Sequence, residues 1–264
     1  MDIVVCIKQV PASSNVKVDP ETGVLIRDGA NTKMNPYDLY ALEAALTLRT
    51  REGGTVRVIT MGPPAANDVL REALYMGADS GILISDRRLG GADVLATSYT
   101  LSSAIKTMGH VDLILCGKQT TDGDTAQVGA EMAEFLGLPQ YSNVRSITHV
   151  NENVIQVVSE LGSTVLTAKI KLPCLLCTDA EINTPRLPSY KLKKQIESGE
   201  EPLSQISLDF FEDKDPKHYG LAGSATAVER IFTPDISDDH AVISGTGKEA
   251  AAQVLDVLLQ KKFL

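Results

Sequence analysis

The apolar positions in the first 140 residues form four short runs, and a stretch with helical periodicity follows each run. The runs read DIVVCIKQV, TVRVITMG, GILIS and VDLILCG, and polar or glycine-containing turns bound them. Continuous apolar runs of this length are typical of strands that are buried on both faces of a sheet. Because strand and helix alternate four times with short connections, the pattern predicts an α/β fold built on a parallel sheet.

The segments between these runs place apolar residues at helical spacing. In NPYDLYALEAALTLR the apolar stripe includes Leu39, Leu42 and Leu46, and Asn35 followed by Pro36 is a typical N-cap and first-turn pair. The other three predicted helices cover NDVLREALYMGA, GADVLATSYTLSSAIKTMG and DTAQVGAEMAEFLG. Crossover helices of this kind are what parallel strands require.

The pattern changes after Pro139. VIQVVSE and VLTAKIKL alternate apolar and polar residues on either side of an LGS turn, which predicts an antiparallel hairpin, and PCLLCT predicts one more strand. From about Asn183 the sequence is irregular and rich in proline and charge, which is typical of a solvated segment or of a partner-recognition loop. The last segment, TGKEAAAQVLDVLLQKKFL, predicts a helix that is capped near Thr246. Such a helix suits packing on another subunit as well as on its own domain.

Composition limits the class of protein. Of the 264 residues, 43% are hydrophobic and 22% are charged, and the formal net charge is −9. An acidic chain without a basic stripe is not typical of nucleic-acid binding. No run reaches the ~18 apolar residues of a membrane helix, and MDIVVCIKQV has the pattern of a strand rather than of a signal peptide. We therefore expect a cytoplasmic protein whose partners include neither nucleic acid nor a membrane.

Cysteine and histidine give little sign of a metal site. Cys174 and Cys177 form a C-x-x-C motif, a spacing that occurs in redox and zinc sites. No second C-x-x-C and no nearby histidine completes a zinc site, and residues i and i+3 of a strand point to opposite faces. We expect this pair to pack in the core, and we expect no metal. The histidines are scattered at His110, His149, His218 and His240.

In an open parallel sheet, ligands bind outside the carboxyl ends of the strands, near a switch in strand order. Four segments would meet at this edge, namely residues 6–11, 61–64, 85–92 and 116–127. The dinucleotide fingerprint G-x-G-x-x-G and the P-loop G-x-x-x-x-G-K-[ST] are both absent from them. A nucleotide at this edge would therefore be bound by a loop of another type.

The stretch CGKQTTDGDTAQVG (116–129) leads from a strand into a helix. Asp124 or Thr125 is placed to cap this helix, so the amides of its first turn would form an anion site. Lys118 can add a cation, and Thr125 and Gln127 can add neutral donors. The two acids would cap amides, shape the turn around Gly123 or meet ribose hydroxyls rather than phosphate. A plain capped helix without any ligand is the alternative interpretation.

A second loop, LGGADVLATSY (89–99), places two glycines at the start of the third helix. Glycines there let a pyrophosphate approach the backbone closely. An ordinary strand–helix loop that needs positive φ angles is the alternative. No Ser-His-Asp or paired-carboxylate constellation stands out, so we expect no catalytic side chain. Any chemistry would belong to a cofactor that the protein positions.

The chain resembles the β subunit of electron transfer flavoproteins in six segments that keep their order. They are VVCIKQVP (4–11), MNPYDLYALEAAL (34–46), MGPP (61–64), LREALYMGAD (70–79), LILCGKQTTDGDTAQVGAEMAEFLGLPQ (113–140) and NTPRLPSYK (183–191). The resemblance covers roughly residues 1–191 and is looser beyond them. It implies a Rossmann-like, adenine-nucleotide-binding (HUP-like) α/β domain with a hairpin addition and an extended C-terminal arm. It also implies an α-subunit partner that carries FAD.

The resemblance implies a cofactor site at the carboxyl edge of the sheet. Phosphate would be bound by backbone amides and by the side chains of Thr125 and Gln127. The implied cofactor-binding residues are Cys6, Asn35, Pro36, Tyr37, Asp38, Met61, Gly62, Gly90, Gly91, Ala92, Thr97, Gly117, Lys118, Gln119, Thr120, Thr121, Asp122, Gly123, Asp124, Thr125, Ala126, Gln127 and Val128.

Two kinds of β subunit fit this resemblance. The electron-bifurcating kind, typical of anaerobic metabolism, binds FAD in the β subunit and takes hydride from NADH. It divides the electrons between ferredoxin and a partner dehydrogenase of the acyl-CoA or 2-hydroxyacid type. Residues 10–29 and 85–99 are similar to this kind, although Ser13 and Ser14 depart from it. The ordinary kind binds AMP as a structural ligand. A stand-alone nucleotide sensor of the same fold is a third hypothesis.

The resemblance also divides the chain by role. Residues 1–190 would form the nucleotide- and flavin-binding domain. Residues 191–264 would form a partner-recognition segment and an arm that packs on the α subunit. Tyr190 and Leu192 are the expected apolar anchors for a partner dehydrogenase, with the surrounding lysines steering an acidic surface towards them. Oxidoreductase activity would then require the α subunit and the dehydrogenase.

Overall fold

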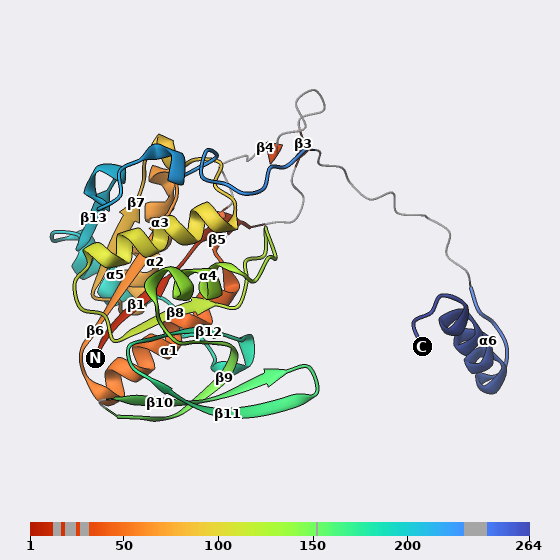
Figure 1. Ribbon diagram of the computed structural model, residues 1–264. Coiled ribbons are helices and arrows are strands. Elements are labelled where there is room, and N and C mark those ends of the chain that lie inside the picture. The colour runs from red at the N-terminus through yellow and green to blue at the C-terminus, as the bar shows by residue number, and fades with distance from the viewer. Residues whose placement is uncertain (13–16, 19–24, 27–31, 152, 230–241) are drawn as a thin grey trace. The chain divides into compact units, whose positions relative to one another are not determined.

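A computed structural model describes residues 1–12, 17–18, 25–26, 32–151, 153–229 and 242–264. Contacts divide the chain into two units, Met1–Glu229 and Arg230–Leu264. The first unit contains the α/β sheet, and the described part of the second contains a helix (Figure 1). The contact boundary thus lies beyond residue 190.

The first unit is built on a nine-stranded sheet with the order β11-β10-β9-β12-β8-β1-β6-β7-β13. The chain fills one side of β1 first, with β6 and β7, and then crosses to the other side with β8. The switch in strand order therefore lies between β1 and β8, where Cys6 pairs with Cys116. The four predicted strands are confirmed as β1 (Asp2–Cys6), β6 (Thr55–Met61), β7 (Ser80–Ile84) and β8 (Leu113–Gly117).

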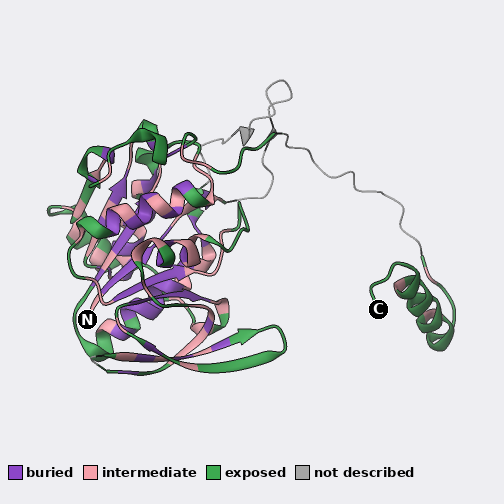
Figure 2. Ribbon diagram, viewed as in Figure 1, coloured by how far each residue is buried: buried purple, intermediate pink, exposed green. Residues whose placement is uncertain are grey.

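Helices cover both faces of this sheet, and their positions follow from the alternation of side chains along each strand. Ile3 and Val5 of β1 belong to the core under α1 (Pro36–Glu52) and α2 (Asn67–Met76). Val4 and Cys6 belong to the core under α3 (Val94–Thr107) and α4 (Val128–Leu136). Figure 2 shows the buried strands between the two helical layers. Burial on both faces explains why these strands read as continuous apolar runs.

The predicted hairpin is confirmed as β10 (Val154–Leu161) and β11 (Thr164–Lys171), which pair in antiparallel register. β9 (Gln140–Val150), which the sequence pattern did not predict, pairs with β10. β12 (Cys174–Thr178) then returns between β9 and β8 and is buried throughout. Cys174 and Cys177 lie on opposite faces of β12 in the two cores, as free thiols. The packing interpretation of the C-x-x-C motif is therefore confirmed.

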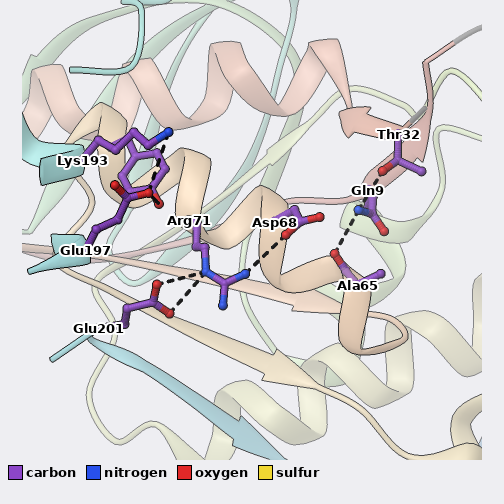
Figure 3. Close-up of polar contacts among 9 residues, drawn as sticks. Gln9, Thr32, Ala65, Asp68, Arg71, Lys193, Glu197 and Glu201 are labelled. Carbon is purple, nitrogen blue, oxygen red and sulfur yellow. Dashed lines mark hydrogen bonds and ion pairs between the residues drawn. The ribbon is translucent and has the colours of Figure 1, made fainter. Parts of the chain in front are cut away.

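The segment after Asn183 is more regular than its composition suggested. Ser189 caps a short helix, α5 (Tyr190–Glu197), and β13 (Leu203–Ile206) adds a parallel strand beside β7. Side chains attach this segment to α2 (Figure 3). The Nε atom of Arg71 donates to Glu201 at 3.0 Å, and the Lys193 ammonium lies 5.8 Å from the centre of the Tyr75 ring. We had expected an irregular segment here.

Short elements complete the first unit. A three-residue ladder joins β2 (Gln9–Pro11) to β5 (Thr32–Met34), and a two-residue ladder joins β3 (Lys17–Val18) to β4 (Leu25–Ile26). Gln9 also donates to Thr32 and to the backbone oxygen of Ala65, which fastens the β2–β5 ladder to the segment that follows β6 (Figure 3). The 3₁₀ turns cover Pro64–Ala66, Arg87–Leu89, Ala180–Ile182, Leu208–Phe210 and Pro216–His218.

The second unit contains α6 (Gly247–Gln260), and the predicted cap is confirmed. Thr246 and Glu249 form a reciprocal capping box in which the Glu249 carboxylate accepts from the Thr246 amide at 2.9 Å. Apolar side chains of the helix and of the residues after it, among them Val254, Leu255 and Phe263, are exposed. In the described part of the chain, no helix has the length and apolar character needed to cross a membrane.

Candidate functional site

The buried side chain of Asn35 joins the start of α1 to the loop that follows β8. Asn35 occupies the N-cap position of α1, as predicted, but it makes no side-chain capping bond. Its Nδ2 atom donates to Asp38 Oδ1 and to the backbone oxygen of Gln119, both at 2.9 Å. Its Oδ1 atom accepts from the amide of Thr121 at 3.2 Å. Asn35 is fully buried, so these bonds have no competition from water.

Asp38 lies beside Asn35, at the switch point between β1 and β8. Its carboxylate accepts from the Lys8 amide at 2.7 Å and from the Gly117 amide, which are the residues that follow β1 and end β8. Burial raises the pKa of Asp38 to about 7, although hydrogen bonds from Asn35 and Lys8 oppose the shift. This carboxyl group therefore titrates near neutral pH.

Only glycine fits at position 117. A Cβ atom there would lie 2.4 Å from Asp38 Oδ1 and 2.7 Å from the carbonyl carbon of Tyr37. The contact brings the end of β8 against the first turn of α1, whose residues Pro36 and Tyr37 belong to the predicted site. This close approach fixes the position from which the 118–127 loop starts.

Both acids of the loop are occupied by other parts of the protein. Asp122 forms an ion pair with Lys8, whose ammonium lies 2.7 Å from Oδ1, across 114 residues of chain. Asp124 accepts from the Gln119 side chain at 2.7 Å. Both acids thus bind protein side chains that hold the loop, and their predicted relation to ribose and phosphate stays a prediction. Lys8 is not among the predicted site residues, although it lies in the 6–11 segment that was expected at this edge.

Two residues of the loop have left-handed backbone conformations. Asp124 has a φ of 51° and Ala126 a φ of 55°. Non-glycine residues rarely adopt these angles, because the conformation is strained. Residues with such strained conformations concentrate in binding loops, where the surrounding structure maintains the strain. Residues 121–127 are exposed. The amides and hydroxyls of the loop are therefore accessible to a ligand.

The start of α4 differs from the prediction that Asp124 or Thr125 caps it. The helix begins at Val128 with Gln127 in the N-cap position, and no side chain caps it. The first bond of the helical pattern runs from the Glu131 amide to the Gln127 oxygen at 3.1 Å. A helix start without a side-chain cap presents donors and a positive dipole end, which is the usual arrangement for binding a phosphate.

Tight packing holds this helix start in place. A Cβ atom on Gly129 would lie 2.3 Å from the sulfur atom of Cys177. The adjacent thiol of Cys116 has its pKa raised by a hydrogen bond with Cys6 and by burial. These thiols are therefore neutral packing groups rather than nucleophiles. Among the described residues, no group of three or more Cys, His, Asp or Glu side chains could bind a metal ion.

Lys118 lies at the beginning of the loop, and its ammonium group already has a carboxylate partner. It pairs with Asp179 at 3.0 Å and lines a polar pocket beside the hairpin, together with Arg145, Glu160 and Glu181. Met61 ends β6 and Gly62 follows it, and the Gly62 amide donates to the Ile84 oxygen.

The second predicted loop is covered by the chain that precedes the second unit. The Leu221 amide donates to the Gly90 oxygen at 3.0 Å, and a Cβ on Gly91 would lie 3.3 Å from that of Leu221. Asp93 caps α3 through the Ala96 amide at 3.0 Å, and its own amide donates to the Ser224 hydroxyl. The start of α3 is therefore already capped by a carboxylate of the protein, at the place where a phosphate would bind. Ala92 precedes this cap, and Thr97 follows within the helix.

The two expected docking residues lie on α5. Tyr190 is 71% exposed, and the ammonium group of Lys194 lies 5.1 Å from the centre of its ring. Leu192 is half-buried. The segment before α5 is anchored by Arg186, whose guanidinium donates twice to the buried carboxylate of Glu43, at 2.7 and 2.8 Å. Tyr190 is thus an exposed aromatic side chain on a fixed element.

Comparison with known proteins connects this site to a family. The sequence profile of the electron transfer flavoprotein domain matches residues 22–209. The chain is 40% identical, over the full length of both chains, to the electron transfer flavoprotein subunit beta of Clostridium acetobutylicum. It is 41% identical, again over both full lengths, to the caffeyl-CoA reductase-Etf complex subunit CarD of Acetobacterium woodii. Identity to Protein FixA of Azorhizobium caulinodans is also 41%, over 97% of this chain and 92% of that protein. The chain belongs to the electron transfer flavoprotein β-subunit family.

Proposed function

We propose that this chain binds FAD at the switch point between β1 and β8 and takes part in flavin-based electron bifurcation with an α subunit. The observation that carries the proposal is the start of α4, which has no side-chain cap and lies after an exposed loop with two left-handed residues. Donors at a helix start at the carboxyl edge of a parallel sheet suit a nucleotide phosphate. FAD would supply hydride acceptance and one-electron transfer.

The residues present fit such a group. The amides at the start of α4 and the side chains of Thr125 and Gln127 would hold its phosphate. Asn35 and Asp38 would hold the loop in position rather than contact the phosphate, because their polar atoms bond to protein groups. Gly117 would keep the end of β8 close to the first turn of α1, since there is no room for a side chain at this position. No side chain of this chain needs to react.

The names of relatives support the partners that we propose. CarD is named as a subunit of a caffeyl-CoA reductase-Etf complex, in which a reductase and an electron transfer flavoprotein occur together. We propose that this chain likewise works with an α subunit and a flavin-dependent dehydrogenase of the acyl-CoA or 2-hydroxyacid type. Hydride would come from NADH, and ferredoxin would accept one of the two electrons. The exposed apolar side chains of α6 suit burial on the α subunit.

The dehydrogenase would dock on α5. Tyr190 is exposed on a helix that Ser189 caps, and Lys193 of this helix lies 5.8 Å from the centre of the Tyr75 ring of α2. Arg71 of α2 binds Glu201, which follows the helix. Exposed aromatic residues on rigid elements are typical anchors of protein interfaces. Leu192, being half-buried, would support the helix and contribute a smaller contact.

An ordinary β subunit with structural AMP is the second candidate, and one observation favours it. The start of α3, where a second phosphate group would bind, is capped by Asp93 and covered by Leu221 and Ser224. A mononucleotide needs the start of α4 alone. The two candidates therefore differ in whether the second loop opens for a larger cofactor.

The test is an NADH oxidation assay on the complex of this chain with its α subunit. We expect NADH oxidation only when a ferredoxin is present together with the dehydrogenase and its oxidised substrate, which is an enoyl-CoA or a 2-oxoacid. Omitting either acceptor should stop it, because bifurcation couples the two electrons. A complex that accepts electrons from the reduced dehydrogenase but never oxidises NADH would overturn bifurcation and support the AMP candidate.

A further inference from the structure

A second pocket lies on the outer side of α3 and α4, and none of its lining residues belongs to the 117–128 loop. Its volume is about 440 Å³, which is in the range of small-molecule sites. Leu95 and Tyr99 of α3 and Phe135 of α4 form its apolar wall, and Lys217, His218 and Ala222 complete it. The pocket is therefore separate from the proposed nucleotide site.

The apolar wall contains two aromatic rings in a fixed arrangement. The rings of Tyr99 and Phe135 meet edge to face, with their centres 5.2 Å apart and their planes at 72°. Leu95 beside them is 38% exposed. The Tyr99 ring also meets His218, with centres 6.2 Å apart, and Tyr219, with centres 5.2 Å apart, so the pair belongs to a larger aromatic cluster. A ligand ring that adds an edge-to-face contact to this cluster gains more than the area that it buries. The wall thus suits a planar aromatic group.

A carboxylate fixes the polar side of the pocket. Asp213 accepts from the Tyr99 hydroxyl at 2.7 Å, contacts Nδ1 of His218 at 2.6 Å and accepts from the Asp215 amide at 3.0 Å. The Tyr219 hydroxyl donates to the backbone oxygen of Asp213 at 2.7 Å, and Tyr219 is fully buried. The His218 ring is therefore held through Nδ1, and Nε2 is its remaining polar atom.

The charges of the pocket favour an anion. The Asp213 carboxylate is already bonded by three groups, and these bonds, that of Tyr99 foremost, lower its pKa to about 2. Asp215 accepts from the amide of Lys217 at 3.0 Å. The bond to Asp213 raises the pKa of His218, which favours its cationic form. The groups that remain to meet a ligand are the ammonium of Lys217 and the Nε2–H of His218.

We propose that this pocket is a second ligand site, which binds a small aromatic molecule bearing one carboxylate. The ring would lie against Tyr99 and Phe135, and the carboxylate would accept from His218 and pair with Lys217. The site does not depend on the proposed nucleotide chemistry, because it shares no residue with the start of α4.

The test uses the full-length chain and 2-naphthoate as the probe. Titration is followed by the histidine side-chain NMR signals, with the His218→Gln variant assigning the His218 signal. We expect a saturable shift of His218 alone. The neutral analogue 2-naphthylmethanol and the Lys217→Gln variant should each bind about tenfold more weakly, because a charge-assisted bond is lost. Lys214→Gln, an exposed lysine outside the pocket, should change nothing.

A second variant separates binding in the pocket from binding elsewhere. Ala222→Phe should fill the pocket and abolish the His218 shift. If Ala222→Phe does not fold, Ala222→Leu replaces it, and this smaller side chain should weaken the binding of naphthoate. Far-UV circular dichroism checks the fold of each variant. The proposal is overturned if naphthoate leaves the His218 signal unmoved. It is also overturned if the neutral analogue binds equally well or if Lys217→Gln behaves like Lys214→Gln.

Discussion

The side-chain amide of Asn35 donates a hydrogen bond to the backbone oxygen of Gln119, 84 residues further along the chain. Replacement of Asn35 by Ala would also remove the partners of Asp38 Oδ1 and the Thr121 amide. Since buried polar groups without partners are costly, we expect the free energy of unfolding to fall by about 2–4 kcal/mol. We also expect the nucleotide to be lost on purification.

Asn183→Ala is the matched control for this variant. Asn183 likewise donates to a backbone oxygen of α1, that of Tyr40, at 2.9 Å, but no bond from it to the loop is present. It should cost about 1 kcal/mol and keep the nucleotide. Urea unfolding and nucleotide analysis of the two purified variants compare them. Equal nucleotide content in both would contradict the positioning role of Asn35.

Asp38 should make stability depend on pH. Its pKa is raised to about 7 in the folded protein from an ordinary value of 3.8. Between these values the folded state binds more protons than the unfolded state, so the unfolding free energy should fall as pH rises from about 4 to about 7. Asp38→Asn cannot titrate. Denaturant unfolding at several pH values should therefore give a difference between the two proteins that changes over this window, and a constant difference would contradict the shift.

Gly117→Ala should be poorly tolerated. Its Cβ would lie 2.4 Å from Asp38 Oδ1 and 2.7 Å from the Tyr37 backbone, so the end of β8 would have to move. We expect a loss of about 2–4 kcal/mol of stability together with the nucleotide. Gly123→Ala in the same loop is the control, because the nearest atom there, Thr120 Oγ1, is 3.4 Å away. Thermal unfolding that ranks the two variants alike would disprove the steric argument.

The strands were predictable from the sequence because they are buried on both faces, so almost every residue of β1 and β8 is apolar. The start of α4 was not, because its position depends on contacts far apart in the chain. Lys8 binds Asp122 across 114 residues. Asp124 and Ala126 adopt left-handed backbone angles that the local sequence does not predict. Asp124 and Thr125 before a helix pattern therefore predicted a cap three or two residues before the observed N-cap, Gln127.

Other elements were hidden by composition. β13 forms where proline and charge indicated a loop, because β7 offers a free edge and Leu203 packs against Gly81. β9 has a mostly half-buried or exposed pattern and irregular register with β10, so its alternation is weak. The loop sequence predicted where the candidate site lies. The residues that hold the loop in position were only partly predicted. Asn35 was predicted as a cap, whereas its side chain anchors the loop.

Tyr190→Ala should affect docking and not stability. The side chain is 71% exposed, so its removal should change the unfolding free energy by less than about 0.5 kcal/mol. We expect electron exchange with the partner dehydrogenase to slow by about tenfold or more, as for an interface anchor. Phe210→Ala removes another exposed aromatic side chain, 63% exposed, outside α5. Stopped-flow rates that fall equally in both variants would contradict a specific anchor at Tyr190.

His218 should titrate above the ordinary histidine range. The hydrogen bond and charge of Asp213 raise its pKa, with Asp215 adding to the shift and Lys217 opposing it. Asp213→Asn should lower this pKa, because the negative partner is removed. The pH dependence of the histidine ring signals in NMR spectra measures both proteins. An unchanged pKa in the Asp213 variant would show that the carboxylate does not control the ring.

The central claim is that the start of α4 binds FAD within a bifurcating complex. The most direct test is to purify this chain with its α subunit, denature the complex and count the released nucleotides, with Asn35→Ala beside it. The account predicts two FAD per heterodimer and no AMP, and one FAD for the variant. One FAD and one AMP in the unmodified complex would contradict the claim and leave an ordinary electron carrier.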